Sequence, residues 1–175
     1  MGSSTRVVSQ GSYRTCKASF VRPANTTAYS AGQVVNNSTS AGAVLTFPQA
    51  TLDSNIGALI VQAVCIDEAN VATHADLQLF LFSAAPAAVN DGAAFAPSNA
   101  EMETLLGVIA FPVASWVVGL SGAGAGGNAV CDSQGLGVSI KTAGGVNAIY
   151  GVLVVRNGYV PVSNEKFVIS LKVID

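Results

Sequence analysis

His74 is the one histidine of the chain, so any reaction that needs an imidazole base must use it. The candidate thiol nucleophiles are Cys16, Cys65 and Cys131, which lie far apart in the sequence, each within or beside an apolar run. Nucleophilic catalysis needs a nucleophile, a base and a group that orients the base, and no GxSxG motif occurs. We therefore predict a non-enzymatic protein with buried, reduced cysteines and with His74 exposed in a loop.

The close pairs of acidic residues are Asp67-Glu68 and Glu101/Glu103. A glycosidase needs two carboxylates that face each other across a sugar site, and aromatic platforms usually flank such a site. Aromatic residues make up 7 % of this chain, and Trp116 is the only tryptophan. We interpret the segment from Asp67 to Asn70 as a polar loop that follows a long strand, and we assign no catalytic residues.

Two further segments resemble binding loops in their residue types but lack the residues that would bind. Asn90-Asp91-Gly92 is typical of a turn, and it lacks the repeated acidic ligands of a calcium loop. Gly122–Gly127 is glycine-rich, yet no lysine follows it as in a phosphate-binding loop. We therefore predict a turn at the first segment, a flexible loop at the second, and neither a metal nor a cofactor.

Charged residues are scarce in this chain. They make up 10 % of it, against about a quarter in an ordinary soluble domain. None lies between Thr104 and Cys131. The net charge is −2 and the lysines and arginines are scattered, which argues against nucleic acid as a partner. A chain with so few charged residues is expected to have part of its surface covered by another subunit or another protein.

Short runs rich in β-forming residues, separated by glycine, proline, asparagine and serine, predict an all-β protein. Their spacing favours one antiparallel β-sandwich over residues 1–175, in which residues 1–12 form an extended N-terminal arm. The predicted strands are Thr5–Gln10, Tyr13–Val21, Gly32–Asn36, Ala43–Phe47, Ile56–Asp67, Asp76–Ser83, Leu105–Phe111, Ser115–Leu120, Leu136–Thr142, Ala148–Arg156 and Lys166–Val173.

Between the strands, the pattern predicts at most one short helix and one long loop. Ser98 and Glu101 have the spacing of a capping box, which starts one or two helical turns. The loop Ala84–Asn99 is long enough to act as a binding loop or a subunit arm. Phe95, Met102 and Trp116 are the candidate interface residues.

Two of the predicted strands, Leu77–Phe82 and Ile149–Val155, are apolar on nearly every position. An antiparallel sheet usually leaves one face in water, so these strands need cover from a long loop or another subunit. The uncharged run Thr104–Leu120 is near the minimum length of a membrane helix. Pro112 at its centre favours two buried strands instead, and we predict no membrane association.

Two segments taken together resemble a known class of protein. They are LQLFLFSAAPAAVNDGAAFAPSNAEMETLLGVIAF (Leu77–Phe111) and AIYGVLVVRNGYVPVSNEKFVISLKVID (Ala148–Asp175). They resemble small virion structural proteins of tailed bacteriophages, and most of all capsid decoration, or cement, proteins. The segment Ala28–Phe47 is also similar to phage head proteins.

This resemblance implies a jelly-roll-like sandwich that forms a homodimer or homotrimer on the exterior of a capsid. Its partner would be the major capsid protein, whose neighbouring subunits it would hold together. The chain would be made in the host cytoplasm, and the family has no catalytic residues. Two alternatives stay open: a phage tail or head-fibre component that binds a receptor, and a carbohydrate-binding β-sandwich.

Overall fold

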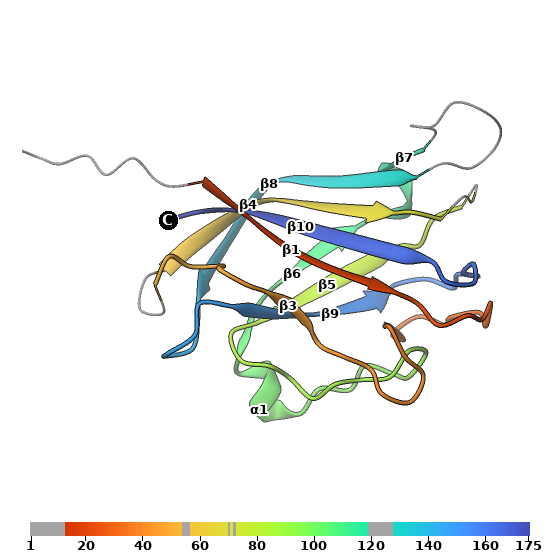
Figure 1. The fold of residues 1–175 in the computed structure, drawn as a ribbon, viewed down its shortest axis with the longest axis horizontal. Helices are drawn as coiled ribbons and strands as arrows, with labels where there is room; N and C mark the ends of the chain where they lie inside the picture. The colour runs from red at the N-terminus through yellow and green to blue at the C-terminus, as the bar shows by residue number, and fades with distance from the viewer. Residues whose placement is uncertain (1–12, 54–56, 70, 72, 119–127) are drawn as a thin grey trace, which may run out of the picture.

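The computed structural model describes residues 13–53, 57–69, 71, 73–118 and 128–175. These residues form two antiparallel sheets that face each other as a sandwich, which confirms the all-β prediction (Figure 1). The first sheet has the order β1-β10-β4-β8-β7 and the second has the order β2-β9-β5-β6, with β3 also paired to β9. The strands are β1 (Tyr13–Val21), β2 (Val34–Val35), β3 (Leu45–Phe47), β4 (Gly57–Asp67), β5 (Leu77–Phe82), β6 (Leu105–Phe111), β7 (Trp116–Val117), β8 (Ala129–Lys141), β9 (Ile149–Val155) and β10 (Lys166–Ile174).

The strand pairs are nested along the chain. β1 pairs with β10, β2 and β3 pair with β9, β4 pairs with β8, and β5 pairs with β6. Two further pairings, β10 with β4 and β9 with β5, join these pairs into the two sheets. The first half of the chain therefore lies against the second half in reverse order. From β8 onward the chain alternates between the sheets, with β8 and β10 in the first sheet and β9 in the second.

The core lies between the sheets and follows the period-2 pattern of the strands. Phe167, Ile169, Leu171 and Val173 of β10 are all buried, as their alternation predicts. Gly151 interrupts the apolar run of β9 for a steric reason. A Cβ atom at this position would lie 2.9 Å from Leu79 Cδ1 on β5 and 2.9 Å from Phe47 Cε2 on β3, so side chains of the two neighbouring strands already occupy the space that a larger residue would need.

The outer face of β5 and β9 is covered by the protein's own long loop. Phe95 of the loop packs its ring against Phe80, with ring centroids 4.9 Å apart, and against Phe82 at 6.4 Å. The loop is also tied to β2, because Val34 N donates to Ala93 O. The need for cover on both faces was predicted correctly, and within one subunit the loop meets part of it.

The uncharged stretch after the helix forms two strands, as predicted, but they are not fully buried, because Val108 on β6 and Val117 on β7 are exposed. β6 ends at Phe111, a 3-10 turn (η1, Val113–Ser115) follows Pro112, and β7 comes next. Within the described part of the chain, no helix has the length and apolarity that a membrane span requires.

The remaining differences from the sequence prediction concern element boundaries. The capping box of Ser98 and Glu101 forms as predicted, but α1 (Asn99–Met102) is a single turn because β6 begins at Leu105. β8 begins at Ala129, well before the predicted Leu136. Gly135, with φ +67°, lies within β8 where the register of β8 with β4 shifts. This bulge interrupts the strand pattern, and the sequence prediction therefore began only after it. The predicted strand Thr5–Gln10 and the loop Gly122–Gly127 lie outside the described residues.

Candidate functional site

A cluster of buried ionisable side chains lies at one end of the sandwich, which is unexpected in a chain with so few charges. Three members come from neighbouring strands of the first sheet. Arg22 follows β1, Glu165 precedes β10 and Asp67 ends β4. The register pairs Val21 with Lys166 and Phe167 with Asp67, so these three residues share one sheet end. The members of the cluster are Arg22, Tyr29, Asp67, His74, Asp91, Tyr159 and Glu165, all buried.

Arg22, Tyr29 and Asp91 form a half of the cluster in which the hydrogen bonds are satisfied. Arg22 Nε donates to the Tyr29 hydroxyl at 2.5 Å, and Arg22 Nη2 donates to Asp91 Oδ2 at 3.2 Å. The Tyr29 hydroxyl in turn donates to Asp91 Oδ1, which also accepts from the backbone N–H of Asn36 at 2.8 Å. Asp91 belongs to the long loop. The predicted turn at Asp91-Gly92 is confirmed, and its carboxylate joins the loop to the first sheet.

Asp67 and His74 form the second half, and both correct the sequence interpretation. Asp67 is the last residue of β4 and is fully buried, not part of an exposed polar loop. His74 is 4 % exposed, not an exposed loop residue. Its Nδ1 lies 2.6 Å from Asp67 Oδ2, and its ring stacks on Trp116 with centroids 5.2 Å apart. A carboxylate partner and an aromatic cover allow a polar ring to be buried in this way.

Glu165 completes the second half, and its carboxylate is poorly compensated. Arg22 Nη1 lies 3.9 Å from Glu165 Oε2, beyond hydrogen-bond distance. Burial raises the pKa of Glu165 to about 8, and the nearby negative charge of Asp67 adds to the effect. Burial also raises the pKa of Asp67 to about 6, whereas it lowers the pKa of His74. Burial and the negative charge of Asp67 therefore favour the protonated form of the Glu165 carboxyl.

Two tyrosines join the halves. The rings of Tyr29 and Tyr159 stack with centroids 5.9 Å apart and planes 5° apart, and their backbones form an isolated bridge. The Arg22 guanidinium lies over the Tyr29 ring, 4.7 Å from its centre. The stack places seven polar side chains in one continuous buried unit.

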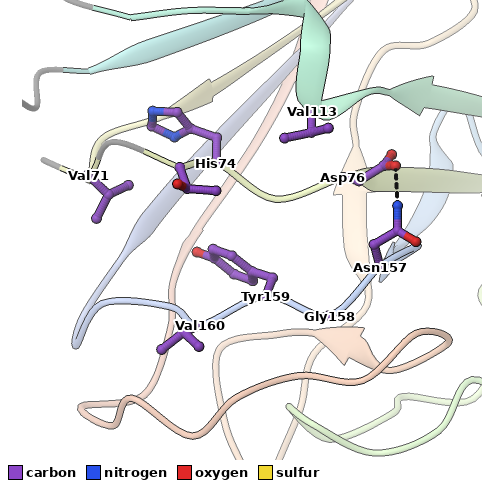
Figure 2. A pocket seen from close by; sticks show the side chains of 9 residues that line it. Val71, His74, Asp76, Val113, Asn157, Gly158, Tyr159 and Val160 are labelled. Carbon is purple, nitrogen blue, oxygen red and sulfur yellow. Dashed lines mark hydrogen bonds between the residues drawn. The ribbon is translucent and has the colours of Figure 1, made fainter.

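An apolar pocket of about 580 Å³ opens beside the second half of the cluster. Figure 2 shows His74 and Tyr159 on its wall, with Val71, Val113 and Val160 around them. At one side, Asn157 Nδ2 donates to Asp76 Oδ2 at 2.8 Å. The pocket lining therefore combines valine side chains with a few polar groups, which suits an apolar ligand group more than a charged one.

An aspartate and a histidine in contact are two parts of a catalytic triad, whose third part is a nucleophile. In a triad the second ring nitrogen accepts from a serine or cysteine. In the described part of the chain, His74 Nε2 has no hydrogen-bond partner. No group of three or more His, Cys, Asp or Glu side chains there has the geometry to hold a metal ion. That the protein is not an enzyme stays a prediction.

Comparison with known proteins gives little further assignment. No protein-family model matches the chain, and no curated protein matches it in sequence. A solved structure described as "Cyanophage Pam1 capsid asymmetric unit" is similar with a TM-score of 0.34 and 12 % identity, over 99 % of this chain and 91 % of that chain. A TM-score and an identity this low carry no argument about fold or function.

The three predicted interface residues lie in different surroundings. Trp116 is 9 % exposed, and its Nε1 donates to Ala75 O at 2.8 Å. Phe95 packs on β5 from the long loop, whereas Met102 of α1 is 41 % exposed. The structure does not bring the three together in one element, and their interface role stays a prediction. The cluster itself was missed because nothing local marks Arg22 or Glu165 as buried.

Proposed function

We propose that this protein is a non-enzymatic structural component of a bacteriophage virion, which decorates the capsid exterior and stabilises the shell. In this proposal its partners are the major capsid protein and further copies of itself, as a homodimer or homotrimer. The resemblance of Leu77–Phe111 and Ala148–Asp175 to decoration proteins suggests the class.

One observation carries the proposal: the uncharged stretch exposes a series of valines. Val108 on β6 is 40 % exposed, Val113 on η1 is 47 % exposed, and Val117 and Val118 are 61 % and 49 % exposed. Val108 lies opposite Phe80 in the second sheet, whereas Val117 lies on the edge strand of the first sheet. Val113, Val117 and Val118 are close together in the chain, and a cluster of exposed apolar side chains marks a site of protein interaction. The exposed valines lie in the stretch of the sequence that has no charged residues, so no charge within this stretch repels a partner.

The strand order supports the jelly-roll form of the sandwich. A jelly roll has two sheets built from nested Greek keys and occurs in viral capsid and lectin domains. Here the pairs β1–β10, β4–β8 and β5–β6 are nested, and β10 pairs with β4 as β9 pairs with β5. Because one fold serves many functions, this strand order supports the proposal only together with the exposed valines of the uncharged stretch.

The mechanism would be mechanical. A protein that binds only the assembled shell adds its binding free energy to the stability of the particle by mass action. Repetition over a symmetric lattice turns weak single contacts into strong overall attachment. Neither step needs a catalytic residue.

The proposal is tested by adding the purified protein to capsid shells that lack it and measuring co-sedimentation and the temperature at which the shells open. We expect binding at saturable stoichiometry and a higher opening temperature. The double variant Val117→Lys/Val118→Lys should lose binding to the shells. Leu52→Lys should keep it, because Leu52 is equally exposed (62 %) but lies outside the uncharged stretch. Failure of the wild-type chain to bind any shell would overturn the proposal.

The carbohydrate-binding alternative predicts exposed aromatic side chains on one face. Among the described residues, Tyr13 is the single aromatic among the exposed large hydrophobic side chains. The observation disfavours that alternative, and a glycan array without hits would dismiss it.

A further inference from the structure

Two of the three cysteines are direct partners across the first sheet. Cys65 on β4 lies opposite Cys131 on β8 in the register of the ladder. Both side chains are fully buried in the core between the sheets, so they lie on the same face. Both are free thiols. The two cysteines are far apart in the sequence, and they become partners only because the strand order places β8 beside β4.

The distances of sheet geometry fit a bond between this pair and exclude the third cysteine. Residues directly opposite in antiparallel strands have Cα atoms roughly 4.5–5.5 Å apart, and a disulfide spans about 4.4–6.8 Å. Cys16 lies on β1, which is separated from β4 by β10. Two strand spacings amount to about 9.5 Å, which is too far for a disulfide.

We propose that Cys65 and Cys131 form a reversible disulfide across β4 and β8, with a low-molecular-weight disulfide of the glutathione type as the oxidant. The chain then has a reduced form with two separate thiols and an oxidised form in which the two central strands are covalently joined. The cross-link closes a long segment of chain, and such links stabilise chiefly by restricting the unfolded state.

The reaction proceeds as two thiol–disulfide exchanges. The Cys131 thiol loses its proton, and its sulfur attacks one sulfur of the oxidant, which releases one small thiolate and leaves a mixed disulfide. The Cys65 thiol then loses its proton, and its sulfur attacks Cys131 Sγ and releases the second small thiolate. The protein loses two protons and two electrons, and the oxidant becomes two thiols.

Access to the pair is controlled by the edge strand. Among the described residues, β7 pairs with β8 through Trp116 opposite Cys131 and Val117 opposite Val130. β7 is the edge strand of the sheet, and an edge strand opens locally more readily than the central strands, so its opening uncovers Cys131 before Cys65. Burial raises the pKa of Cys131 to about 11 and also raises that of Cys65. Oxidation of the folded protein is therefore slow and accelerates as the pH rises.

The setting of this redox step rests on the proposed function. A virion protein is made in a reducing cytosol and later meets oxidising surroundings, where disulfides persist. The dithiol would then be the form that assembles, and the disulfide the form that stabilises released particles. The formation of the bond itself is tested on the purified protein, independently of any shell.

The experiment incubates the reduced full-length protein with oxidised glutathione at mildly alkaline pH, then alkylates the free thiols in denaturant. Digestion with trypsin and a glutamate-specific protease separates the three cysteines, because Lys17 lies between Cys16 and Cys65, and Glu68 and Glu101 lie between Cys65 and Cys131. We expect a Cys65–Cys131 linked peptide, an alkylated Cys16, a mass decrease of about 2 Da before alkylation and a higher thermal midpoint.

Matched variants separate the outcomes. Cys16→Ala should form the linked peptide as the wild-type chain does, whereas Cys131→Ala should not form it. The peptide map of the wild-type protein decides the matter even if a variant folds poorly. Three alkylated thiols after incubation, a stable glutathione adduct without the link, or a link that includes Cys16 would each overturn the inference. If the link fails to form under oxidation while the chain still binds shells, the proposed function stands and only this inference falls.

Discussion

The Arg22–Tyr29–Asp91 half of the buried cluster and the Asp67–His74–Glu165 half touch through two stacked tyrosines, yet their charges are balanced differently. In the first half a guanidinium meets a carboxylate, and a tyrosine hydroxyl bonds to both. In the second half two carboxyls lie near one histidine, and the guanidinium is 3.9 Å from Glu165 Oε2.

The difference has a physical consequence. Buried charge is tolerated where it is paired and hydrogen-bonded, and elsewhere the group changes its protonation state. The first half is expected to act as a fixed link between the long loop and the first sheet. In the second half, burial favours the protonated form of Glu165, so the contribution of this half to stability depends on pH.

Loss of the shared cation should have the largest effect. Arg22→Met keeps much of the side-chain volume but leaves Asp91 buried without its positive partner. Removing one member of a buried ion pair costs about 3–5 kcal/mol, so we expect a loss of that order in the free energy of unfolding, measured by urea denaturation. A loss below about 1 kcal/mol, the size typical of a surface pair, would contradict the description of this half.

Glu165→Gln should remove a pH dependence from the second half. A carboxyl whose pKa is raised on folding binds more protons in the folded state, so stability falls as the pH rises toward the folded value. For Glu165 the interval runs from its ordinary 4.5 to about 8. The lowered pKa of His74 acts in the opposite sense below its ordinary 6.5. The fall in stability caused by Glu165 is therefore clearest from pH 6.5 to 8.

In that range we expect the wild-type free energy of unfolding to fall by up to a few kcal/mol, and the Glu165→Gln value to stay nearly constant. Urea denaturation at a series of pH values measures both. Glu68→Gln, which removes an exposed carboxylate paired with Lys166, serves as the control and should retain the wild-type slope. An unchanged slope in Glu165→Gln would show that another group carries the proton.

The two stacked tyrosines allow the halves to be compared with one kind of substitution. Tyr29→Phe removes a hydroxyl that bonds to Arg22 and Asp91, and an unsatisfied buried group costs about 1–3 kcal/mol. The Tyr159 hydroxyl has no hydrogen bond of ordinary geometry among the described residues, so Tyr159→Phe should cost less. Thermal and urea unfolding measure which of the two variants loses more stability. A larger loss of stability for Tyr159→Phe than for Tyr29→Phe would reverse the comparison.

The smallest effect is expected at an ion pair outside the cluster. Arg156 Nη1 lies 3.7 Å from Asp76 Oδ1, and the Arg156 side chain is 44 % exposed. Arg156→Met should change the free energy of unfolding by less than about 1 kcal/mol, because water screens an exposed pair. A loss as large as that of Arg22→Met would mean that burial does not distinguish the two sites.

Local patterns were sufficient to predict much of the fold. The alternation in β10, the capping box at Ser98 and the break at Pro112 each depend on neighbours within a few residues, and each is confirmed. The first half of β8 was missed because Gly135 forms a bulge that only the partner strand explains. His74 was misplaced because its partner Asp67 and its cover Trp116 come from other elements.

The sequence by itself determined the class of fold, because hydrophobic periodicity and turn residues act over short distances. It also determined the scarcity of charge and the apolar character of both faces of β5 and β9. Only the tertiary structure decided where the few charges lie, because the nested strand order brings the ends of β1, β4 and β10 together. The same order placed Cys65 opposite Cys131 and folded the long loop onto its own sheet, since long-range pairing has no local signal.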